Sequence, residues 1–219
     1  MLRTQKDWID RYEQNGALWI HDGNPKRPHA LLTSGKHSDG FFNSELIMED
    51  SALLAEACSN LLQRLEIGER VVLSKIDRVV GPAMGAITMA HELARQISEG
   101  TGHRCLRAYT EKFEKIMVFQ RTIIKPTELV LLVEDVLTTG GSVGITSAAV
   151  AATHGYILPF VAVLVNRSGL THVDEKKIIA LIDRPMPMWA ADDCPLCKKG
   201  SEAIRPKGTE NWKRLNASY

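Results

Sequence analysis

The residues whose types and spacing most clearly suit ligand binding or catalysis lie between positions 130 and 143, in the segment VLLVEDVLTTGGSV. Apolar residues come first, the adjacent acids Glu134 and Asp135 follow, and a run of Thr, Gly and Ser ends the segment. Such an apolar run predicts a buried strand of a parallel sheet. Because ligands of parallel sheets bind where the strands end, the acids and the turn after them are candidate site residues.

The turn after the acids is suited to a phosphate group. Gly140 and Gly141 allow backbone N–H groups to point into a common concavity, while Thr138, Thr139 and Ser142 add hydroxyl donors. A helix beginning near Ser142 adds the partial positive charge of its N-terminus. These features predict a cradle for a phosphate monoester.

The two acids suit a different chemical group, because carboxylates repel a phosphate. They favour the paired hydroxyls of a ribose, or a Mg²⁺ ion. A sugar phosphate satisfies both halves of the segment. A P-loop needs a Lys after its last Gly, and a dinucleotide fingerprint places its acid after the glycines, so neither motif fits. Taken without context, the acids and the turn are equally consistent with an ordinary strand end and helix start.

The elements that must position these residues alternate along the chain. We expect short strands around a turn in residues 30–43 and a helix around Trp8 and Tyr12. Further strands are predicted at 71–73 or 79–80, 105–109, 129–133, 158–165 and 178–182, and further helices at 51–65, 86–97 and 142–153. Alternation with strands that are apolar on both faces predicts an α/β fold with a mostly parallel central sheet flanked by helices.

The whole chain limits the classes of function. Its 219 residues suffice for one core, so we expect a single domain with a hood at 1–50, a core at 51–183 and an irregular tail at 184–219. The 27 Lys and Arg nearly balance the 26 Asp and Glu, which argues against a nucleic-acid partner. The longest apolar stretch, YILPFVAVLV, is too short to span a bilayer, and the N-terminal segment lacks a signal-peptide pattern. We expect a cytoplasmic protein with small-molecule substrates and no membrane partner.

The segment at residues 130–143 resembles the phosphoribosyl diphosphate (PRPP) signature of type I phosphoribosyltransferases. Other segments are similar to orotate phosphoribosyltransferases in particular. LLTSGKHSDGFFN resembles their N-terminal hood, VVGPAMGAITMA their pyrophosphate loop, AYTEKFEK the start of their mobile catalytic loop, and VLVNRSG a strand end that carries an Arg. The tail CPLCKKG resembles that of a bacterial subgroup typified by Thermus enzymes.

The resemblance implies an activity and its requirements. A glycosyltransferase of this family moves 5-phosphoribose from PRPP to orotate, giving orotidine 5′-monophosphate and pyrophosphate in de novo pyrimidine (UMP) biosynthesis. It implies the type I phosphoribosyltransferase fold, Mg²⁺ held mainly through PRPP, and a homodimer with active sites shared between subunits. A phosphoribosyltransferase for another nucleobase and a non-catalytic PRPP or nucleotide sensor remain alternatives.

The resemblance also assigns the residues that contact PRPP. Glu134 and Asp135 would bind the ribose hydroxyls, and the turn at 138–142 would bind the 5′-phosphate. Gly81, Pro82 and Ala83 would hold the pyrophosphate. Lys112 would reach the site on the mobile loop as a cation, and Lys112 and Asp135 are the implied catalytic residues.

Orotate is a flat ring with a carboxylate. The resemblance places Arg167 against this carboxylate, where a planar guanidinium binds in a bidentate way. It implies Phe41 and Phe42 as the cover of the ring. Ser34, Gly35 and Lys36 would offer polar groups to the edge of the ring.

Three positions depart from the better known enteric-type pattern by lacking a basic residue: Thr33, Met84 and Glu111. The subgroup with the CPLC tail shares the changes at Met84 and Glu111. Positive charge near the pyrophosphate is therefore depleted, and Lys36, Lys115 or Arg121 are the candidates to compensate.

Two of the four cysteines, Cys194 and Cys197, form the pair in CPLC. A closed zinc site needs four ligands, and no second pair is near in the sequence. We expect a reduced structural pair, with zinc as the alternative if a second tail or a His such as His172 completed the site. The cysteine count does not suggest a disulfide framework, which fits a reducing compartment.

Overall fold

A computed structural model describes residues 2–219, and a seven-stranded sheet forms its centre. Its strands, in spatial order, are β10 (His172–Val173), β11 (Lys176–Asp183), β9 (Tyr156–Asn166), β8 (Leu129–Leu137), β5 (Arg78–Pro82), β6 (Leu106–Phe113) and β7 (Ile116–Val118). The two edge strands β10 and β7 are antiparallel to their neighbours, and all pairings between β11 and β6 are parallel. The predicted α/β fold with a mostly parallel sheet is confirmed.

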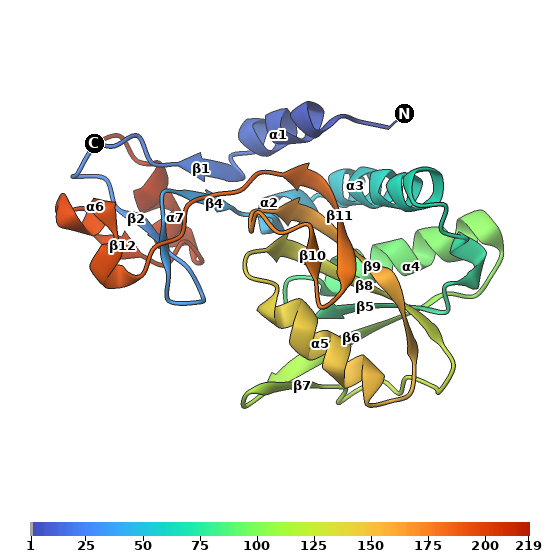
Figure 1. Cartoon of the computed structure of the whole chain (residues 1–219). Helices are drawn as coiled ribbons and strands as arrows, with labels where there is room; N and C mark the ends of the chain where they lie inside the picture. Colours follow the sequence, from blue (N-terminus) through green and yellow to red (C-terminus); the bar gives the residue numbers. More distant parts are fainter. Residues whose placement is uncertain (1) are drawn as a thin grey trace.

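Helices cover both faces of this sheet (Figure 1). On one face lie α1 (Gln5–Gln14), α3 (Ser51–Gln63) and α4 (Ile87–Thr101), and on the other lies α5 (Gly141–Ala151). Strand β8 shows why, because Leu131 and Val133 pack into the core beneath α3 and α4, whereas Val130 and Leu132 pack on the side of α5. Successive residues of a strand point to opposite faces of the sheet, so a strand with consecutive apolar residues must be covered on both faces. None of the helices described in residues 2–219 has the length and apolar character needed to cross a bilayer.

A separate lobe stands to the left in Figure 1 and combines the hood with the tail. In one ladder, β1 (Leu18–Ile20) pairs with β4 (Gly40–Phe42). In another, β2 (His29–Leu31) lies between β3 (His37–Ser38) and the tail strand β12 (Ala203–Ile204). The tail also contains α6 (Pro195–Lys198) and α7 (Thr209–Asn216). The prediction of an irregular tail is wrong, since the tail supplies a strand of the hood sheet.

Smaller differences from the predicted elements have local causes. The strand near position 79 is confirmed as β5, but the alternative at 71–73 is wrong, because a 3-10 turn (Leu73–Lys75) occupies that region. Helix α3 begins after Asp50, whose carboxylate accepts from the N–H groups of Ala52 and Leu53, as is usual for an N-cap. The short edge strands β7 and β10 and the short helix α2 (Glu45–Met48) were not predicted. Short helical turns also lie at Arg64–Gly68, directly after α3, and at Ala191–Asp193 in the tail.

Candidate active site

The site lies where the chain changes direction across the sheet, between β5 and β8. From β5 the chain continues to β6 on one side, and from β8 it continues to β9 on the other. Loops that leave adjacent parallel strands in opposite directions open a crevice at the carboxyl ends of those strands. The pairing of β5 with β8 ends at Val80 and Leu132, so the edge of β8 toward β5 is open beyond that point.

Glu134 and Asp135 lie in this open part of β8. The expectation that they follow the strand is wrong, because β8 continues to Leu137 and Glu134 pairs with Val163 of β9. Glu134 is buried and Asp135 is half-buried. Burial, and next the charge of Asp135, hold the pKa of the Glu134 carboxyl well above its ordinary value. The positive charge of Lys207, from the tail, acts weakly in the opposite direction.

The turn at residues 138–142 follows the acids directly and leads into α5. Glu134 and residues 136–142 line a small pocket at this point. Helix α5 begins at Gly141, and its N-cap Gly140 has a φ of 78°, a left-handed conformation that favours glycine. Within residues 2–219, the backbone N–H groups of residues 139–142 donate to no acceptor. Unsatisfied N–H groups at a helix N-terminus are the donors that bind a phosphate.

The predicted pyrophosphate loop folds back against the acids. Gly81 and Pro82 end β5, and the Ala83 N–H donates to the Thr110 carbonyl at 2.7 Å, which anchors the loop to β6. The peptide bond between Ala83 and Met84 is cis. Gly85 then lies against the carboxyl group of Asp135. The structure therefore brings together the loop, the acid pair and the phosphate turn.

Lys112 and Glu111 lie at the end of β6 rather than in a loop. Lys112 pairs with Met117 of β7, so the segment predicted to begin the mobile loop forms a β-hairpin in this structure. Lys112 is exposed, and no carboxylate of the described residues lies within ion-pair distance of it. Arg121 Nε lies 3.4 Å from Glu111 Oε2, so part of the positive charge expected to compensate for Glu111 is neutralised by that same residue.

Arg167, the residue predicted to bind orotate, has an unusual environment. It follows β9, its N–H donates to the Leu137 carbonyl, and its side chain is buried with an exposed fraction of 1%. Its guanidinium donates to the Gly40 carbonyl at 3.0 Å and to Ser38 Oγ at 2.6 Å, while its Nε has no partner. Burial lowers the pKa of Arg167 to about 10. In the described part of the chain, no carboxylate forms an ion pair with this buried cation.

The two phenylalanines of the hood occupy different environments. Phe42 has an exposed fraction of 1% and packs edge-on against Tyr12, with ring centroids 5.4 Å apart, so it belongs to the core. Phe41 is half-buried and lies 5.9 Å from the ring of Trp212 in α7. Of this predicted pair, Phe41 has the more accessible ring.

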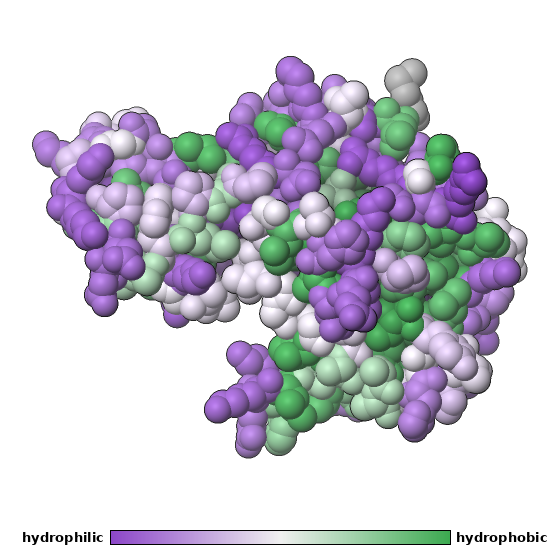
Figure 2. All heavy atoms as spheres, in the orientation of Figure 1, coloured by the Kyte–Doolittle hydropathy of each residue, from purple (hydrophilic) through white to green (hydrophobic). Residues whose placement is uncertain are grey.

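Ser34, Gly35 and Lys36 are exposed at the tip of the β2–β3 hairpin. The Leu32 N–H donates to the Lys36 carbonyl at 2.8 Å, and Gly35 has a φ of 81°, so a tight turn presents these residues. Figure 2 shows a hollow between the lobe that carries this hairpin and the main body.

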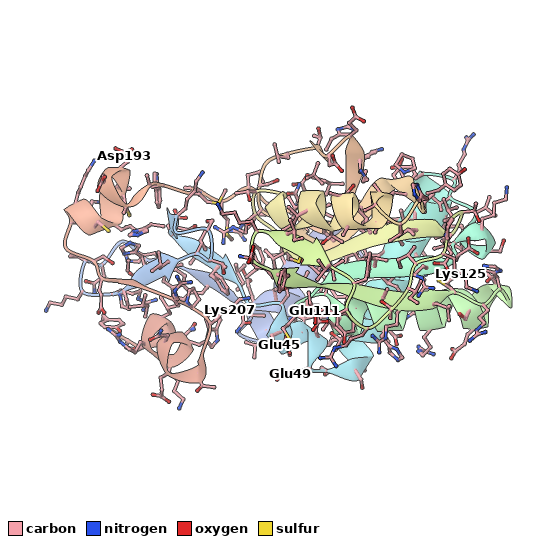
Figure 3. The ribbon with its side chains drawn as sticks, turned by 90° about the horizontal axis from the view of Figure 1, so that it is seen from below. Glu45, Glu49, Glu111, Lys125, Asp193 and Lys207 are labelled. Atoms are coloured by element: carbon pink, nitrogen blue, oxygen red, sulfur yellow. The ribbon has the colours of Figure 1, made fainter. Side chains whose placement is uncertain are left out.

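Three residues at this junction were not predicted from the sequence. Ser38 and Gly40 hold the Arg167 guanidinium, and Lys207 acts on Glu134. In Figure 3, Lys207 lies where the lobe meets the main body, toward Glu111 and away from Asp193 at the outer end of the lobe. No sequence signal marks Lys207, because its place depends on how the tail folds onto the hood.

Comparison with solved structures defines the class of protein. The structure is similar to the orotate phosphoribosyltransferase of Aeropyrum pernix, with a TM-score of 0.57 and 20% identity over 79% of this chain and 91% of that one. It is also similar to the adenine phosphoribosyltransferase of Saccharomyces cerevisiae, with a TM-score of 0.57 and 16% identity over 81% of this chain and 99% of that one. At these identities the similarity shows the fold alone, which is that of the type I phosphoribosyltransferases.

Sequence comparison defines the family. The chain is 35% identical to an orotate phosphoribosyltransferase of Acidithiobacillus ferrooxidans over 87% of this chain and 93% of the relative. It is 37% identical to another from Pelotomaculum thermopropionicum over 87% of this chain and 94% of the relative. No protein-family model matches the chain. The chain belongs to the orotate phosphoribosyltransferases, which are glycosyltransferases.

Proposed function

We propose that this chain transfers 5-phosphoribose from PRPP to orotate and releases orotidine 5′-monophosphate and pyrophosphate, a step of UMP biosynthesis. The names of its relatives give the substrate, and one observation on the structure carries the base site. That observation is the buried Arg167 guanidinium, which has no carboxylate partner in residues 2–219.

A buried cation without an anionic partner is unfavourable, because burial removes its hydration and the neutral acceptors Gly40 and Ser38 replace only part of it. An incoming carboxylate would supply the missing charge. Orotate carries one on a flat ring, and a guanidinium can bind it through two parallel hydrogen bonds. Arg167 adjoins β8 through its hydrogen bond to Leu137, so a ring held there faces the sugar-phosphate half of the site.

The PRPP half of the site uses the residues at the ends of β8 and β5. In our proposal, Glu134 and Asp135 hold the ribose hydroxyls and the turn at 138–142 holds the 5′-phosphate. The unsatisfied N–H groups of residues 139–142 support this assignment. Gly81, Pro82 and Ala83 would hold the pyrophosphate. Lys112, exposed on the β6–β7 hairpin, would add a cation.

Mg²⁺ fits the donors of this site. The half-buried Asp135 offers hard carboxylate oxygens of the kind that Mg²⁺ prefers, and most ligands of the ion would be oxygens of PRPP itself. When bound, the ion neutralises the charge that develops on the departing pyrophosphate. This contribution matters in a chain with Met84 and Glu111 at positions where basic residues are found in enteric-type relatives.

The chain acts by placing its substrates. Transfer would pass through an oxocarbenium-like state at C1′, with N1 of orotate attacking from the face opposite the pyrophosphate. Arg167 would orient the ring so that N1 faces C1′, and the backbone of the turn and of the pyrophosphate loop would fix the other reactant. Exclusion of water protects the cation from hydrolysis. No covalent nucleophile is required.

We further propose that the chain forms a homodimer and acts in the cytoplasm. The β6–β7 hairpin exposes Phe113 and Ile116, each with an exposed fraction of 56%, which is apolar surface that a second subunit would cover. The hairpin also carries Lys112, so the dimer would share residues between sites. The four cysteines are free thiols, as in a reducing compartment.

The test is the steady-state kinetics of an Arg167→Lys variant. This variant keeps the positive charge but loses the planar guanidinium that can donate two parallel hydrogen bonds. We expect kcat/KM for orotate to fall roughly tenfold or more, because the ammonium cannot form the second of the two charge-assisted hydrogen bonds, and one such bond is worth about 1.5–3 kcal/mol. PRPP affinity, measured by calorimetry, should stay within about twofold, since Arg167 lies on the base side. The exposed Arg104→Lys variant is the matched control. Equal kinetics of the two variants would remove Arg167 from the base site.

A further inference from the structure

Four potential metal ligands from distant parts of the chain meet inside the lobe. His29 on β2 and His37 on β3 face Cys194 and Cys197, which lie at the start and within α6. One donor atom of each residue lies within 4.8 Å of the other three donor atoms. His29, His37 and Cys194 are buried, and Cys197 is half-buried. This cluster lies outside the PRPP and orotate sites proposed above.

The distances match the edges of a tetrahedral zinc site. His29 Nε2 lies 3.5 Å from Cys194 Sγ and 3.5 Å from Cys197 Sγ, and Cys197 Sγ lies 3.2 Å from His37 Nδ1. The two ring nitrogens are 3.0 Å apart. With Zn–S bonds of about 2.3 Å and Zn–N bonds of about 2.0–2.1 Å, a tetrahedron has S···N edges of about 3.6 Å and an N···N edge of about 3.3 Å.

Hydrogen bonds alone do not satisfy this cluster. His29 Nε2 is within hydrogen-bonding range of three atoms, namely His37 Nδ1 and both sulfurs. A neutral ring nitrogen offers either one proton or one lone pair, so it can serve only one of these three neighbours well. A cation between the four atoms would accept one lone pair from each of them.

The surroundings of His29 hold it in the form that ligates metal. Ser201 Oγ donates its proton to the Arg27 carbonyl at 2.6 Å, so the same oxygen accepts from His29 Nδ1–H at 2.8 Å. The Nε2 lone pair is therefore directed at the cysteines. Metal-binding histidines are commonly oriented by such a second hydrogen bond.

We propose that His29, His37, Cys194 and Cys197 bind one zinc ion in a closed structural site that fixes the C-terminal tail to the hood. Two sulfur and two imidazole ligands in a tetrahedron select zinc over harder ions such as Mg²⁺. Four protein ligands leave no position for a substrate. His172, the residue suggested from the sequence as an additional ligand, lies on β10 and is not part of the cluster.

A bound zinc ion would stabilise the fold of this lobe. Among residues 2–219, the separate core cluster of this lobe is small and consists of five buried apolar residues: Trp19, Ala30, Leu32, Ile204 and Leu215. Strand β12 adds two residues of pairing. A core of this size supplies little free energy of folding, and a bound metal commonly supplies the rest in small units. His37 also adjoins Ser38, which accepts a hydrogen bond from Arg167, so the ion would stabilise the hood strand next to the base side.

The first experiment uses the wild-type full-length chain. After refolding or dialysis with zinc sulfate under reducing conditions and removal of loose metal, elemental analysis should find one zinc per chain. Replacement with Co²⁺ should give the absorption bands of tetrahedral cobalt together with a thiolate charge-transfer band. Neither readout depends on activity or on the folding of a variant. Wild-type protein that retains no zinc, or a Co²⁺ spectrum without the thiolate band, would overturn the proposal.

Matched variants then test the ligands. Cys197→Ala and His29→Ala should lose stoichiometric zinc, while Cys105→Ala and His172→Ala should keep it. Ser201→Ala should retain all four ligands but bind zinc about 10- to 100-fold more weakly, because it removes the hydrogen bond that orients His29. A chelator should lower the Tm of wild type and leave that of Cys197→Ala unchanged. Equal zinc content in Cys197→Ala and Cys105→Ala, or a metal-free chain with a Cys194–Cys197 disulfide, would contradict the site.

Discussion

Gly85 lies directly against the carboxyl group of Asp135, so that a Cβ atom at Gly85 would come within 2.8 Å of the Asp135 Cγ and of both its oxygens. The loop after β5, proposed to hold pyrophosphate, and strand β8 therefore approach each other as closely as a residue without a side chain allows. The side chain of Asp135 is thereby held between these two segments, at the proposed sugar site.

Replacing Gly85 with Ala should move Asp135 and impair the sugar site. A misplacement of about 1 Å in a site of this kind commonly lowers the rate by roughly 100-fold, so we expect kcat/KM for PRPP to fall by at least about tenfold. The control is Gly100→Ala, because Gly100 has open space around its Cβ position. Unchanged PRPP kinetics in Gly85→Ala would show that the position of Asp135 is not critical.

Gly140 is required for two independent reasons, and its replacement should weaken phosphate binding. Its φ is 78°, and an added Cβ would come within 2.3 Å of Val173 Cγ2. We expect Gly140→Ala to distort the turn, to lower the free energy of unfolding by about 1–3 kcal/mol and to weaken PRPP binding measured by calorimetry.

Gly144, one turn further along α5, is the matched control for Gly140. It has open space and ordinary helical geometry, so Gly144→Ala should be neutral or stabilise the chain by up to about 1 kcal/mol. Equal PRPP affinity in the two variants would argue against the turn as the phosphate site.

Glu134 should make the stability of the ligand-free chain depend on pH. Its folded pKa is raised above the ordinary value of 4.5 by burial. Below pH 4.5 the folded and unfolded chains are both protonated at this position. As pH rises, the unfolded chain ionises first, so the free energy of unfolding falls by up to about 1.4 kcal/mol per pH unit until the folded carboxyl also ionises.

Glu134→Gln cannot lose a proton, so its stability relative to wild type should increase as pH rises from about 5. Chemical denaturation at several pH values between 5 and 8 measures this difference. The exposed Glu49→Gln variant is the control. A constant difference between Glu134→Gln and wild type across this range would show that the carboxyl is not held protonated.

The sequence predicted the central sheet and the turn into α5 because both depend on local patterns. The apolar run of β8, the adjacent acids and the glycines of the turn are consecutive in the chain, and the structure keeps them together. The exact end of β8 was missed, since continued pairing with β9 carries the strand past the acids. Charge alone suggested that the strand would end there.

The lobe was predicted less well because its contacts join distant residues. His29 and Cys194 are 165 positions apart, and β12 pairs with β2 across a similar separation. No spacing rule links a histidine in the hood to a cysteine in the tail. The burial of Arg167 beneath β3 and β4 has the same origin, because it depends on the docking of the hood onto the sheet.

The most direct test of the proposed activity is the turnover of orotate by the wild-type chain with PRPP and Mg²⁺. The loss of orotate absorbance should be followed beside parallel reactions with hypoxanthine, adenine and uracil. Because the buried Arg167 has no carboxylate partner in residues 2–219, we predict that orotate alone is consumed, with stoichiometric release of pyrophosphate. Consumption of another base instead of orotate would contradict the base assignment, and binding of PRPP without turnover of any base would identify a sensor rather than an enzyme.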